Sequence, residues 1–351
     1  MKKIGDLFTQ SSGKALKKSN QIGTLHKYIT TSNLFWGRFD FSEVREMFFQ
    51  DSELEKCTAR NGDLLVCNGG DVGRAAVWNY DYDICLQNHI TRLRKKSENV
   101  NPCYYQHFFR YIKTNNLING NGVGIESLSS KEILNMSVPY PSIEEQNRIV
   151  DIFDRIQFAI DNKKQQLSLL DEAVKSEFVE MFSDLDCKIK TIEQTCTMKS
   201  GTTFSKNEEN DSGEIFYIKV SGMNLPENDK YIKTSLSFVS RKVAGKTIIP
   251  ANSIIFPKRG GAIGTNKKRI TEQEICIDLN TMAVTPSNEL NIQYLYQYFQ
   301  NLDMGKLYNG STVPQINNKD IGPLKIKVPP LELQQQFAAF VEQIDKSKFV
   351  L

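Results

Sequence analysis

Pro141-Ser-Ile-Glu-Glu-Gln146 and Pro329-Pro-Leu-Glu-Leu-Gln334 are two copies of one motif, and they decide the organisation of this 351-residue chain. Further similar segments precede both copies in the same order, at an offset that stays between 188 and 191 residues: Ser12-Gly13 with Ser200-Gly201, Tyr28-Ile29 with Tyr217-Ile218, Gly69-Gly70 with Gly260-Gly261, and Ile84-Cys85 with Ile275-Cys276. Solenoid repeats have much shorter periods of roughly 20 to 50 residues. The chain is therefore predicted to contain two copies of a whole domain.

Each copy of the motif is predicted to begin a helix. After the first copy, apolar residues recur at steps of three and four from Ile149 to Met181 without a Gly or Pro, which is the heptad pattern of a coiled coil. Glu144-Glu145 lies in the first turn, where the helix dipole favours acidic side chains. The second copy begins the same pattern, and the sequence ends at Leu351. We predict a central helix over residues 143–183 and a short C-terminal helix over residues 331–351.

The two bodies that precede these helices are predicted to be α+β. Short β-branched and aromatic runs bounded by Gly, Asn and Asp indicate strands, such as Asp63–Cys67 and Ser253–Phe256. Helical patterns follow at Asn101–Thr114 and Asn291–Leu302. Each body should therefore be a small mixed sheet with helices at one side. We place the four parts of the chain at residues 1–142, 143–183, 184–330 and 331–351.

The two bodies are basic, whereas the central helix is acidic. Residues 1–142 carry 18 Lys and Arg against 14 Asp and Glu, and residues 184–330 carry 19 against 15, so each body has a net charge of +4. Residues 143–183 carry 5 against 9, which gives a net charge of −4. A basic body favours a polyanionic partner such as DNA because binding releases counterions, whereas an acidic helix is repelled by the same partner.

Several classes of function find no support in the sequence. The seven cysteines are scattered without a C-x-x-C pair and the three histidines form no H-E-x-x-H, so we expect neither a disulfide framework nor a metal site. Residues 260–264 lack the spacing of a phosphate-binding loop, and Val138-Pro139-Tyr140-Pro141 lacks the leading Asn or Asp of an amino-methyltransferase motif. No apolar stretch approaches the roughly 18 residues of a membrane span. We expect a cytoplasmic protein without a cofactor or catalytic residues.

Basic and amide side chains near the glycine turns are the candidates for contacts with DNA. Five basic residues lie within twelve positions, at 258–269, and residues 309–320 are rich in Asn, Gln, Ser and Thr, which can hydrogen-bond base edges. An ordinary surface turn is the alternative for both segments. The predicted DNA-binding residues are Lys14, Lys17, Arg74 and Arg92 in the first body, and Lys219, Lys258, Arg259, Lys267, Lys268, Arg269, Thr312 and Gln315 in the second.

Together these features resemble a known family. Two unlike basic bodies, each closed by a Pro-x-(Ile/Leu)-Glu-x-Gln motif that begins a coiled-coil helix, resemble the DNA-specificity subunit of type I restriction–modification systems. The best matching segments are Pro141–Ile156, Gly310–Val328 and Pro329–Ile344. The resemblance implies that each body is a target recognition domain for one half of a split DNA sequence. It also implies a pseudo-two-fold arrangement in which the two helices pair antiparallel and dock two modification (methyltransferase) subunits, to which restriction or motor subunits are added.

The short second helix departs from the family's pattern. With a partner helix of half the length, residues from Asp161 onward are expected to be exposed, which favours self-association or binding of another chain. The predicted subunit-interface residues are Ile149, Phe153, Ile156, Leu167, Leu170, Val174 and Phe178. The pseudo-two-fold axis predicts half-site centres about one helical turn, roughly 10 bp, apart. The alternative function is a non-catalytic two-domain scaffold that binds protein partners through its coiled coil.

Overall fold

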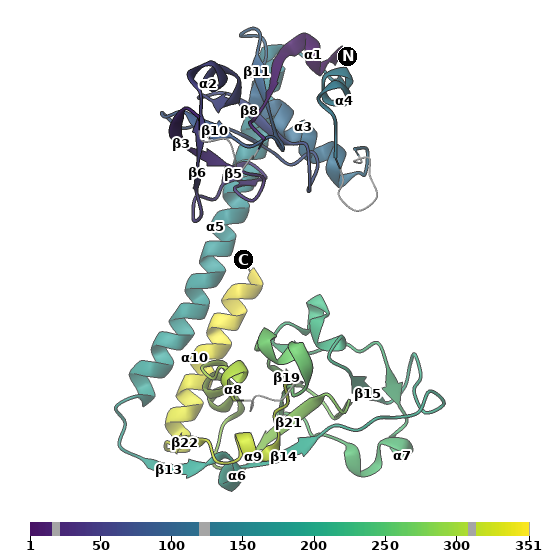
Figure 1. The fold of residues 1–351 in the computed structure, drawn as a ribbon. Coiled ribbons are helices and arrows are strands. Elements are labelled where there is room, and N and C mark those ends of the chain that lie inside the picture. The colour runs from purple at the N-terminus through teal and green to yellow at the C-terminus, as the bar shows by residue number, and fades with distance from the viewer. Residues whose placement is uncertain (16–21, 119–126, 308–313, 351) are drawn as a thin grey trace. The chain divides into compact units, whose positions relative to one another are not determined.

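The computed structural model describes residues 1–15, 22–118, 127–307 and 314–350. They form two compact units, unit 1 from Met1 to Asp161 and unit 2 from Asn162 to Leu351, and each has its own sheets and core. The division falls within the long helix α5 (Ile143–Phe182), so that α5 belongs to both units (Figure 1). The predicted central helix is confirmed as α5, and the predicted C-terminal helix as α10 (Leu331–Val350). No helix in the described part of the chain is long and apolar enough to cross a membrane.

Unit 1 is built on two four-stranded sheets. Its elements are β1 (Lys2–Lys3), α1 (Ile4–Leu7), β2 (Phe8–Ser12), β3 (Thr24–Ile29), β4 (Leu34–Phe35), β5 (Arg38–Phe39), β6 (Arg45–Phe49), α2 (Asp51–Cys57), β7 (Thr58–Ala59), β8 (Leu64–Cys67), β9 (Ala75–Val77), β10 (Ile84–Leu86), β11 (Ile90–Lys95), α3 (Pro102–Thr114), α4 (Ser130–Asn135) and β12 (Ser137–Val138). The strand orders are β2-β11-β8-β9 and β6-β3-β10-β7. Helix α3 covers the first sheet and buries Tyr105, Phe109 and Ile112 against it.

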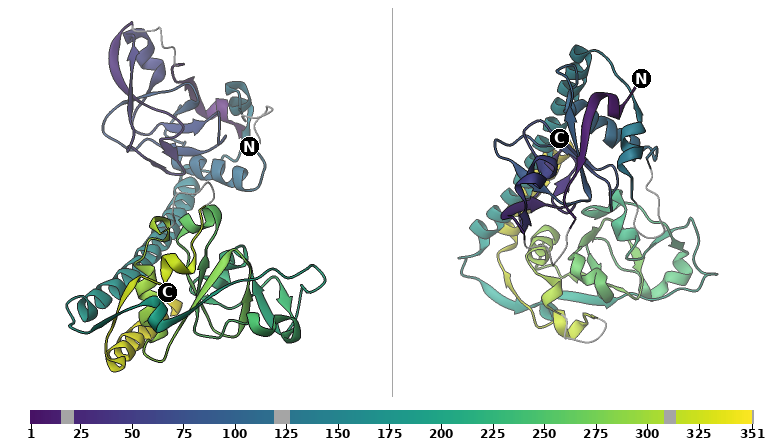
Figure 2. Two further views of the ribbon diagram at one scale, coloured as in Figure 1. Left: turned by 60° about the horizontal axis from the view of Figure 1, so that its bottom comes forward. Right: turned by 45° about the horizontal axis from the view of Figure 1, so that its top comes forward.

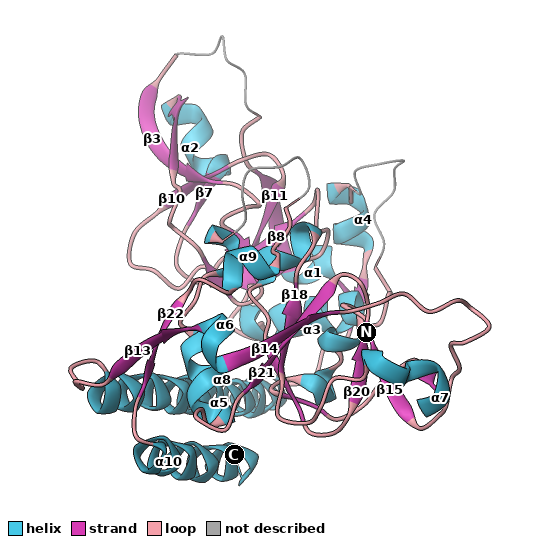
Figure 3. Cartoon of the chain, turned by 90° about the horizontal axis from the view of Figure 1, so that it is seen from below, coloured by secondary structure: helices cyan, strands magenta, loops and turns pink. Residues whose placement is uncertain are grey.

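Unit 2 repeats this plan with a five-stranded and a three-stranded sheet (Figure 3). Its strands are β13 (Lys188–Thr191), β14 (Cys196–Ser200), β15 (Ile215–Ile218), β16 (Tyr231–Ile232), β17 (Phe238–Val239), β18 (Ile254–Pro257), β19 (Arg269–Thr271), β20 (Ile275–Ile277), β21 (Thr281–Pro286) and β22 (Lys325–Val328). Its further helices are α6 (Ile192–Thr195), α7 (Arg241–Ala244), α8 (Ile292–Gln300) and α9 (Asn318–Ile321), with 3₁₀ turns η1 (Gly222–Asn224), η2 (Pro226–Asn228), η3 (Gly245–Thr247), η4 (Gly260–Thr265) and η5 (Met304–Lys306). The strand orders are β14-β21-β18-β19-β16 and β17-β15-β20.

The repeat in the sequence appears as the same strand pairing in both units. In unit 1 β3 pairs in parallel with β10, with Tyr28 opposite Cys85, and in unit 2 β15 pairs in parallel with β20, with Tyr217 opposite Cys276. The first and last strands of each unit also pair antiparallel, β1 with β12 and β13 with β22. Segments that match in sequence therefore occupy equivalent positions in the two units. The prediction of two α+β domains of one kind, joined by a long helix, is confirmed.

The repeated Ser-Gly pair is explained by a close approach of two backbones. A Cβ atom on Gly13 would lie 2.2 Å from the carbonyl oxygen of Leu86, and one on Gly201 would lie 2.0 Å from that of Asp278. Non-bonded heavy atoms do not tolerate such distances, so only glycine lets β2 and β14 end against the neighbouring turn.

In unit 2, α10 packs antiparallel along the C-terminal half of α5 (Figures 1 and 2). The ring of Phe337, near the start of α10, lies 5.4 Å from that of Phe178 and 5.7 Å from that of Phe182. At the other end of α10, Lys348 donates a hydrogen bond of 2.5 Å to Asp171. The last turns of α5 are therefore covered by a helix of the same chain.

This packing corrects the predicted exposure of α5. Val174 is only 9% exposed and Phe178 packs against the core of unit 2, so both expectations are wrong, whereas Leu167 is exposed and Leu170 is partly buried. The reason lies in the strands next to the two helices. Strand β13 follows α5, strand β22 leads into α10, and the two strands pair with each other. The start of α10 is therefore held beside the end of α5. The large apolar residues of α5 that are 43% to 69% exposed in unit 1 are Ile152, Phe153, Ile156, Phe158 and Ile160.

The last residue of the first motif, Gln146, ties α5 to the body of unit 1. Its side chain is fully buried, and its Oε1 accepts a hydrogen bond of 2.9 Å from the backbone N–H of Asn101 at the start of α3. Its Nε2 donates to the backbone carbonyls of Asn99 (3.1 Å) and Pro141 (3.0 Å). One side chain thus joins two helix starts.

Gln334 has the same role in unit 2. It is also fully buried, and its Oε1 accepts a hydrogen bond of 2.8 Å from the backbone N–H of Asn291 at the start of α8. Its Nε2 donates to the carbonyls of Glu289 (3.0 Å) and Pro329 (2.8 Å). The motif is therefore a structural clamp, used twice with the same three bonds.

Replacing Gln146 by Ala is expected to destabilise unit 1 by about 2–4 kcal/mol, because one backbone N–H and two carbonyls lose their partner in a buried site. Both tryptophans, Trp36 and Trp78, lie in unit 1, so their fluorescence during urea unfolding reports this unit. The matched control is Gln157→Ala, which removes an exposed amide from the same helix and should cost less than about 0.5 kcal/mol. Equal losses for the two variants would contradict the clamp.

Candidate nucleic-acid interface

Several connections meet at one end of the main sheet in each unit. In unit 1 the turn after β8 lies beside the turn before β11, because the two strands are antiparallel neighbours, and the end of β2 lies next to them. Isolated bridges add one more segment, since Gly69 pairs with Ser127 in unit 1 and Arg259 with Gln315 in unit 2. We call these segments the turn cluster: residues 68–70, 87–89 and 127 in unit 1, and residues 258–260, 278–280 and 315 in unit 2.

The backbone of the turn cluster is the same in both units. Three hydrogen bonds from a backbone N–H to a backbone carbonyl recur. In unit 1 they run from Asn68 to His89 (3.0 Å), from Leu128 to Asn68 (2.9 Å) and from Ile90 to Gln87 (2.9 Å). In unit 2 the equivalent bonds run from Lys258 to Asn280 (2.7 Å), from Ile316 to Lys258 (2.9 Å) and from Thr281 to Asp278 (2.9 Å). Gly70 and Gly260 are equivalent and adopt left-handed φ angles of +75° and +69°, which favour glycine. The predicted match of Gly69-Gly70 with Gly260-Gly261 is therefore wrong by one residue.

The side chains on this shared backbone differ between the units. The counterparts are Asn68 and Lys258, Gly69 and Arg259, Gln87 and Asp278, His89 and Asn280, and Ser127 and Gln315. With histidine neutral, the cluster of unit 1 carries no charge, whereas that of unit 2 carries two cations and one carboxylate. One backbone therefore presents two different sets of hydrogen-bonding groups.

Amide groups dominate the cluster of unit 1. Gln87 donates from Nε2 to Oδ1 of Asn88 at 2.8 Å, and Asn68 donates from Nδ2 to Oγ1 of Thr91 at 3.0 Å. The Oδ1 atom of Asn68 is buried and has no hydrogen-bond partner in the described part of the chain, and His89 is exposed. These groups offer both donors and acceptors without a net charge.

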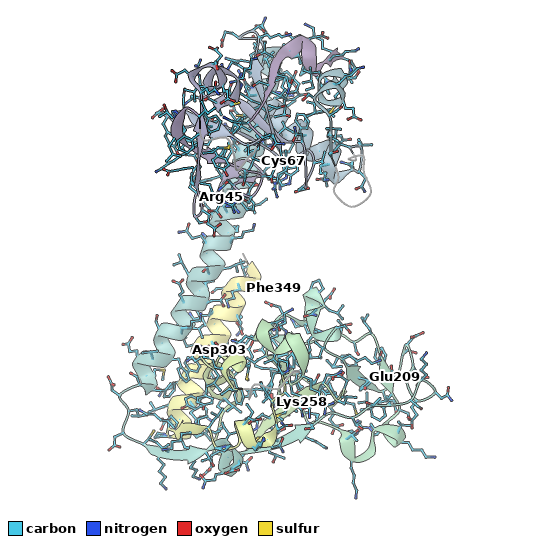
Figure 4. The ribbon with its side chains drawn as sticks, viewed as in Figure 1. Arg45, Cys67, Glu209, Lys258, Asp303 and Phe349 are labelled. Atoms are coloured by element: carbon cyan, nitrogen blue, oxygen red, sulfur yellow. The ribbon has the colours of Figure 1, made fainter. Side chains whose placement is uncertain are left out.

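Charged groups dominate the cluster of unit 2, where Lys258 follows β18 (Figure 4). Lys258 is buried and donates to Oγ of Ser200 at 2.7 Å; burial, and then the charge of Arg259, lower the pKa of Lys258. Asp278 accepts a hydrogen bond of 2.8 Å from Nδ2 of Asn280. Arg259 is partly exposed, and its Nε is buried without a partner among the described residues.

Comparison with known proteins identifies the kind of molecule that carries these clusters. A family model described as "Type I restriction modification DNA specificity domain" matches residues 1–172 and residues 185–350. The chain belongs to this family. The resemblance seen in the sequence is thereby confirmed, and so is the prediction that the chain is a specificity component and not the catalytic subunit of a restriction system.

This specificity subunit spans most of the length of the relatives that it matches. The type I restriction enzyme MjaVIII specificity subunit of Methanocaldococcus jannaschii is 21% identical over 98% of this chain and 85% of its own length, and the MjaIX specificity subunit of the same organism is 23% identical over 98% and 86%. The crystal structure of a type I restriction–modification S subunit from M. genitalium superposes with a TM-score of 0.59 at 15% identity, covering 99% of this chain and 89% of that one. This likeness supports the fold.

Four predicted DNA-binding cations of the specificity subunit are buried and bonded within their own unit. Lys14 pairs with Glu53 (2.5 Å), Arg92 donates to the carbonyl of Thr58 (2.5 Å), Lys258 to Ser200 and Lys268 to the carbonyl of Leu302 (2.8 Å). Arg92 is 7% exposed and Lys268 is 0% exposed. These side chains stabilise turns of the fold and are not accessible to a phosphate group. The sequence could not distinguish them from surface cations, since charge alone carries no sign of burial.

The other predicted residues that the structure describes are partly exposed. Arg74 donates to the carbonyl of Thr31 (2.6 Å), Lys219 pairs with Glu209 (2.5 Å), Lys267 donates to Asn224, and Arg269 donates to the carbonyl of Lys268 (2.9 Å). Arg259 and Gln315, which are 56 residues apart, are brought together in the turn cluster. Lys17 and Thr312 lie outside the described residues. DNA contact by any of these residues stays a prediction.

Several members of the turn cluster were missed by the sequence analysis. No role was predicted for Gln87, Asn88, His89, Asp278 and Asn280, although they lie within two to four residues of the matched segments Ile84-Cys85 and Ile275-Cys276. A comparison of polar residues just after each matched segment would have found them. In the described part of the chain, no group of three or more His, Cys, Asp and Glu is placed to hold a metal ion.

Lys268 is expected to contribute an increase in the stability of unit 2 between pH 8 and pH 10. Burial lowers the pKa of this lysine from 10.5 to about 8, so in this interval the unfolded chain binds more protons than the folded one, and the free energy of unfolding increases with pH. The variant Lys268→Met should lack this increase in urea unfolding followed by circular dichroism. The control Lys267→Met, at the partly exposed neighbouring position, should follow the wild-type pH profile. Parallel profiles for wild type and Lys268→Met would refute the assignment.

Proposed function

We propose that this specificity subunit recognises a bipartite duplex target, with one turn cluster at each half-site, and directs methyltransferase and restriction subunits to it in the cytoplasm. The observation that carries the proposal is the shared backbone of the two turn clusters with exchanged side chains, as at Gly69 and Arg259. Two binding sites of one shape that present different hydrogen-bonding groups suit two half-sites of different sequence. The subunit needs no cofactor of its own for this task.

Each turn cluster supplies groups for contacts with base edges. Asparagine and glutamine match the donor and acceptor of adenine, and arginine matches the two acceptors of guanine. In unit 2 the exposed Lys319 lies on the first turn of α9, four residues after Gln315, and is suited to a phosphate group. Phosphate contacts position a protein on the duplex, whereas base contacts specify the sequence. With the two units on one face of the duplex, the half-site centres lie about 10 bp apart.

The exposed apolar stretch of α5 in unit 1 is the surface that we propose for a methyltransferase subunit. Phe153 and Ile156 belong to the same heptad seam as Val174 and Phe178, which α10 covers in unit 2. A further helix along this stretch would bury the seam in the same way. Residues 143–161 carry five acidic and two basic side chains, so the bound helix should have basic flanks. A second copy of the chain is the other candidate for this surface.

Selection of bound duplexes from a random pool is expected to enrich two short motifs at one fixed spacing, because two separate clusters recognise them. Binding should also weaken steeply between low and moderate salt, because several phosphates are contacted. The selection is run with the chain alone and with its methyltransferase subunit. Enrichment of one contiguous motif would contradict a bipartite target, and no enrichment in both cases would favour the protein-scaffold function.

The variant Ile156→Asp is expected to lose co-purification with the methyltransferase subunit, because it places a charge in the exposed seam of α5. Gln157→Asp, which adds the same charge one residue away on the exposed helix, should retain the complex. Binding of the free chain to selected DNA should be unchanged in both variants. Light scattering on the chain alone tests whether a second copy of the chain binds this surface. The surface would be assigned to self-association if the chain is a dimer, if Ile156→Asp but not Gln157→Asp dissociates it, and if Ile156→Asp still binds the methyltransferase subunit.

A further inference from the structure

Arg259 and Gln315 lie opposite each other in an isolated antiparallel bridge of unit 2, and we call the two bridged segments, residues 258–260 and 314–316, the ribbon. Backbone hydrogen bonds flank the pair on both sides: from Gly260 to the carbonyl of Pro314 (2.9 Å) and from Ile316 to the carbonyl of Lys258 (2.9 Å). Side chains of directly paired residues project from the same face, with Cβ atoms about 4.5–5.5 Å apart. A two-stranded ribbon is one of the elements that the major groove of DNA accommodates. The two side chains could therefore face adjacent base pairs.

Arg259 differs from the other predicted cations of unit 2 because its guanidinium group is unengaged. The others have partners in their own unit. Lys219 pairs with Glu209, and Lys258 and Lys267 donate to the side chains of Ser200 and Asn224. Lys268 and Arg269 donate to the backbone carbonyls of Leu302 and Lys268. In the described ranges Arg259 has neither a hydrogen bond nor an ion pair, and its Nε is buried and unpaired. The buried Nε is out of reach of a bound base, so the donors that this partly exposed side chain offers to one are its terminal nitrogens.

Unit 1 has no side chain at the equivalent point. The counterpart of Arg259 is Gly69, and a Cβ atom there would lie 2.7 Å from Nδ1 of His89. The φ angle of Gly69 is not positive, so the backbone does not require glycine at this position. The imidazole of His89 occupies the space that a side chain at position 69 would need. The two units therefore differ at one defined point of the same ribbon.

We infer that Arg259 is the residue with which unit 2 recognises a guanine, through paired hydrogen bonds to O6 and N7, with Gln315 at the neighbouring base pair. The paired arginine–guanine contact is the commonest specific contact in the major groove. Unit 1 recognises its half-site without a guanidinium group at this point. The inference rests on the proposed function and adds to it the base that one named side chain selects.

The test measures the binding of the full chain to its selected duplex and to duplexes with one base pair changed at a time. The wild-type chain is expected to prefer guanine at one position of one half-site by about tenfold to hundredfold. Arg259→Gln should abolish that preference or shift it toward adenine, while the other half-site keeps its preferences. The matched control is Arg241→Gln, which removes an exposed arginine of α7, outside the turn cluster, and should leave all preferences unchanged. Gln315→Ala should relax only the adjacent base pair.

Three results separate this inference from the proposed function. A loss of guanine preference in Arg259→Gln alone supports the inference, provided that circular dichroism shows an unchanged fold. Weaker binding of Arg259→Gln to every duplex by the same factor, with the guanine preference intact, would overturn it, because Arg259 would then contact a phosphate. Absence of any two-part motif with the wild-type chain would overturn the proposed function and the inference together.

Discussion

The buried glutamine at the end of each Pro-x-(Ile/Leu)-Glu-x-Gln motif is the interaction on which the rest of the structure depends. Gln146 and Gln334 each satisfy a backbone N–H at the start of one helix and a carbonyl at the start of another. Helix starts leave backbone groups without partners, and a buried start needs a side chain to pair them. Because the side chain has three partners, it holds the long helix in one direction relative to its own body.

The two units use the same framework around this clamp for different packing. Tyr105 and Tyr294 occupy equivalent places, and each donates from its hydroxyl to a carbonyl just before α5 or α10, at 3.2 Å and 3.0 Å. In unit 2 the ring of Tyr294 is covered by Phe178, with the centroids 5.3 Å apart, whereas in unit 1 the ring of Tyr105 packs on Phe8. Helix α5 therefore contributes an exposed seam to unit 1, whereas in unit 2 the last turns of its seam are covered.

Much of the fold followed from the sequence, because repeated segments carry information that a single copy does not. The matches of Tyr28 with Tyr217 and of Cys85 with Cys276 correspond to equivalent parallel strand pairs. The extent of α5 was also predictable, because its forty residues contain no Gly or Pro and carry apolar side chains at helical spacing. The sequence did not predict which half of the apolar seam of α5 would be covered. The pairing of β22 with β13 decides where α10 begins, and contacts between distant strands leave no local signal in the sequence.

The candidate site was less predictable than the fold. Charge singled out Lys14, Arg92, Lys258 and Lys268, but the structure uses all four to satisfy buried hydrogen-bond acceptors. A lysine whose stem is buried has the same local sequence as one on the surface. The side chains at positions 87–89 have no formal charge to mark them, and they become candidates only because the turns meet at one end of the sheet.

The pair of Gly69 and His89 makes the two units unequal as starting points for new target sequences. At position 259 a side chain is already present, so a single codon change alters the group that the ribbon carries there. At position 69 any new side chain meets the imidazole of His89, so its effect depends on what residue 89 is and how it rotates. Changes at contacting positions are not additive. Evolution or engineering of unit 1 would therefore proceed by coupled substitutions, whereas unit 2 can change one residue at a time.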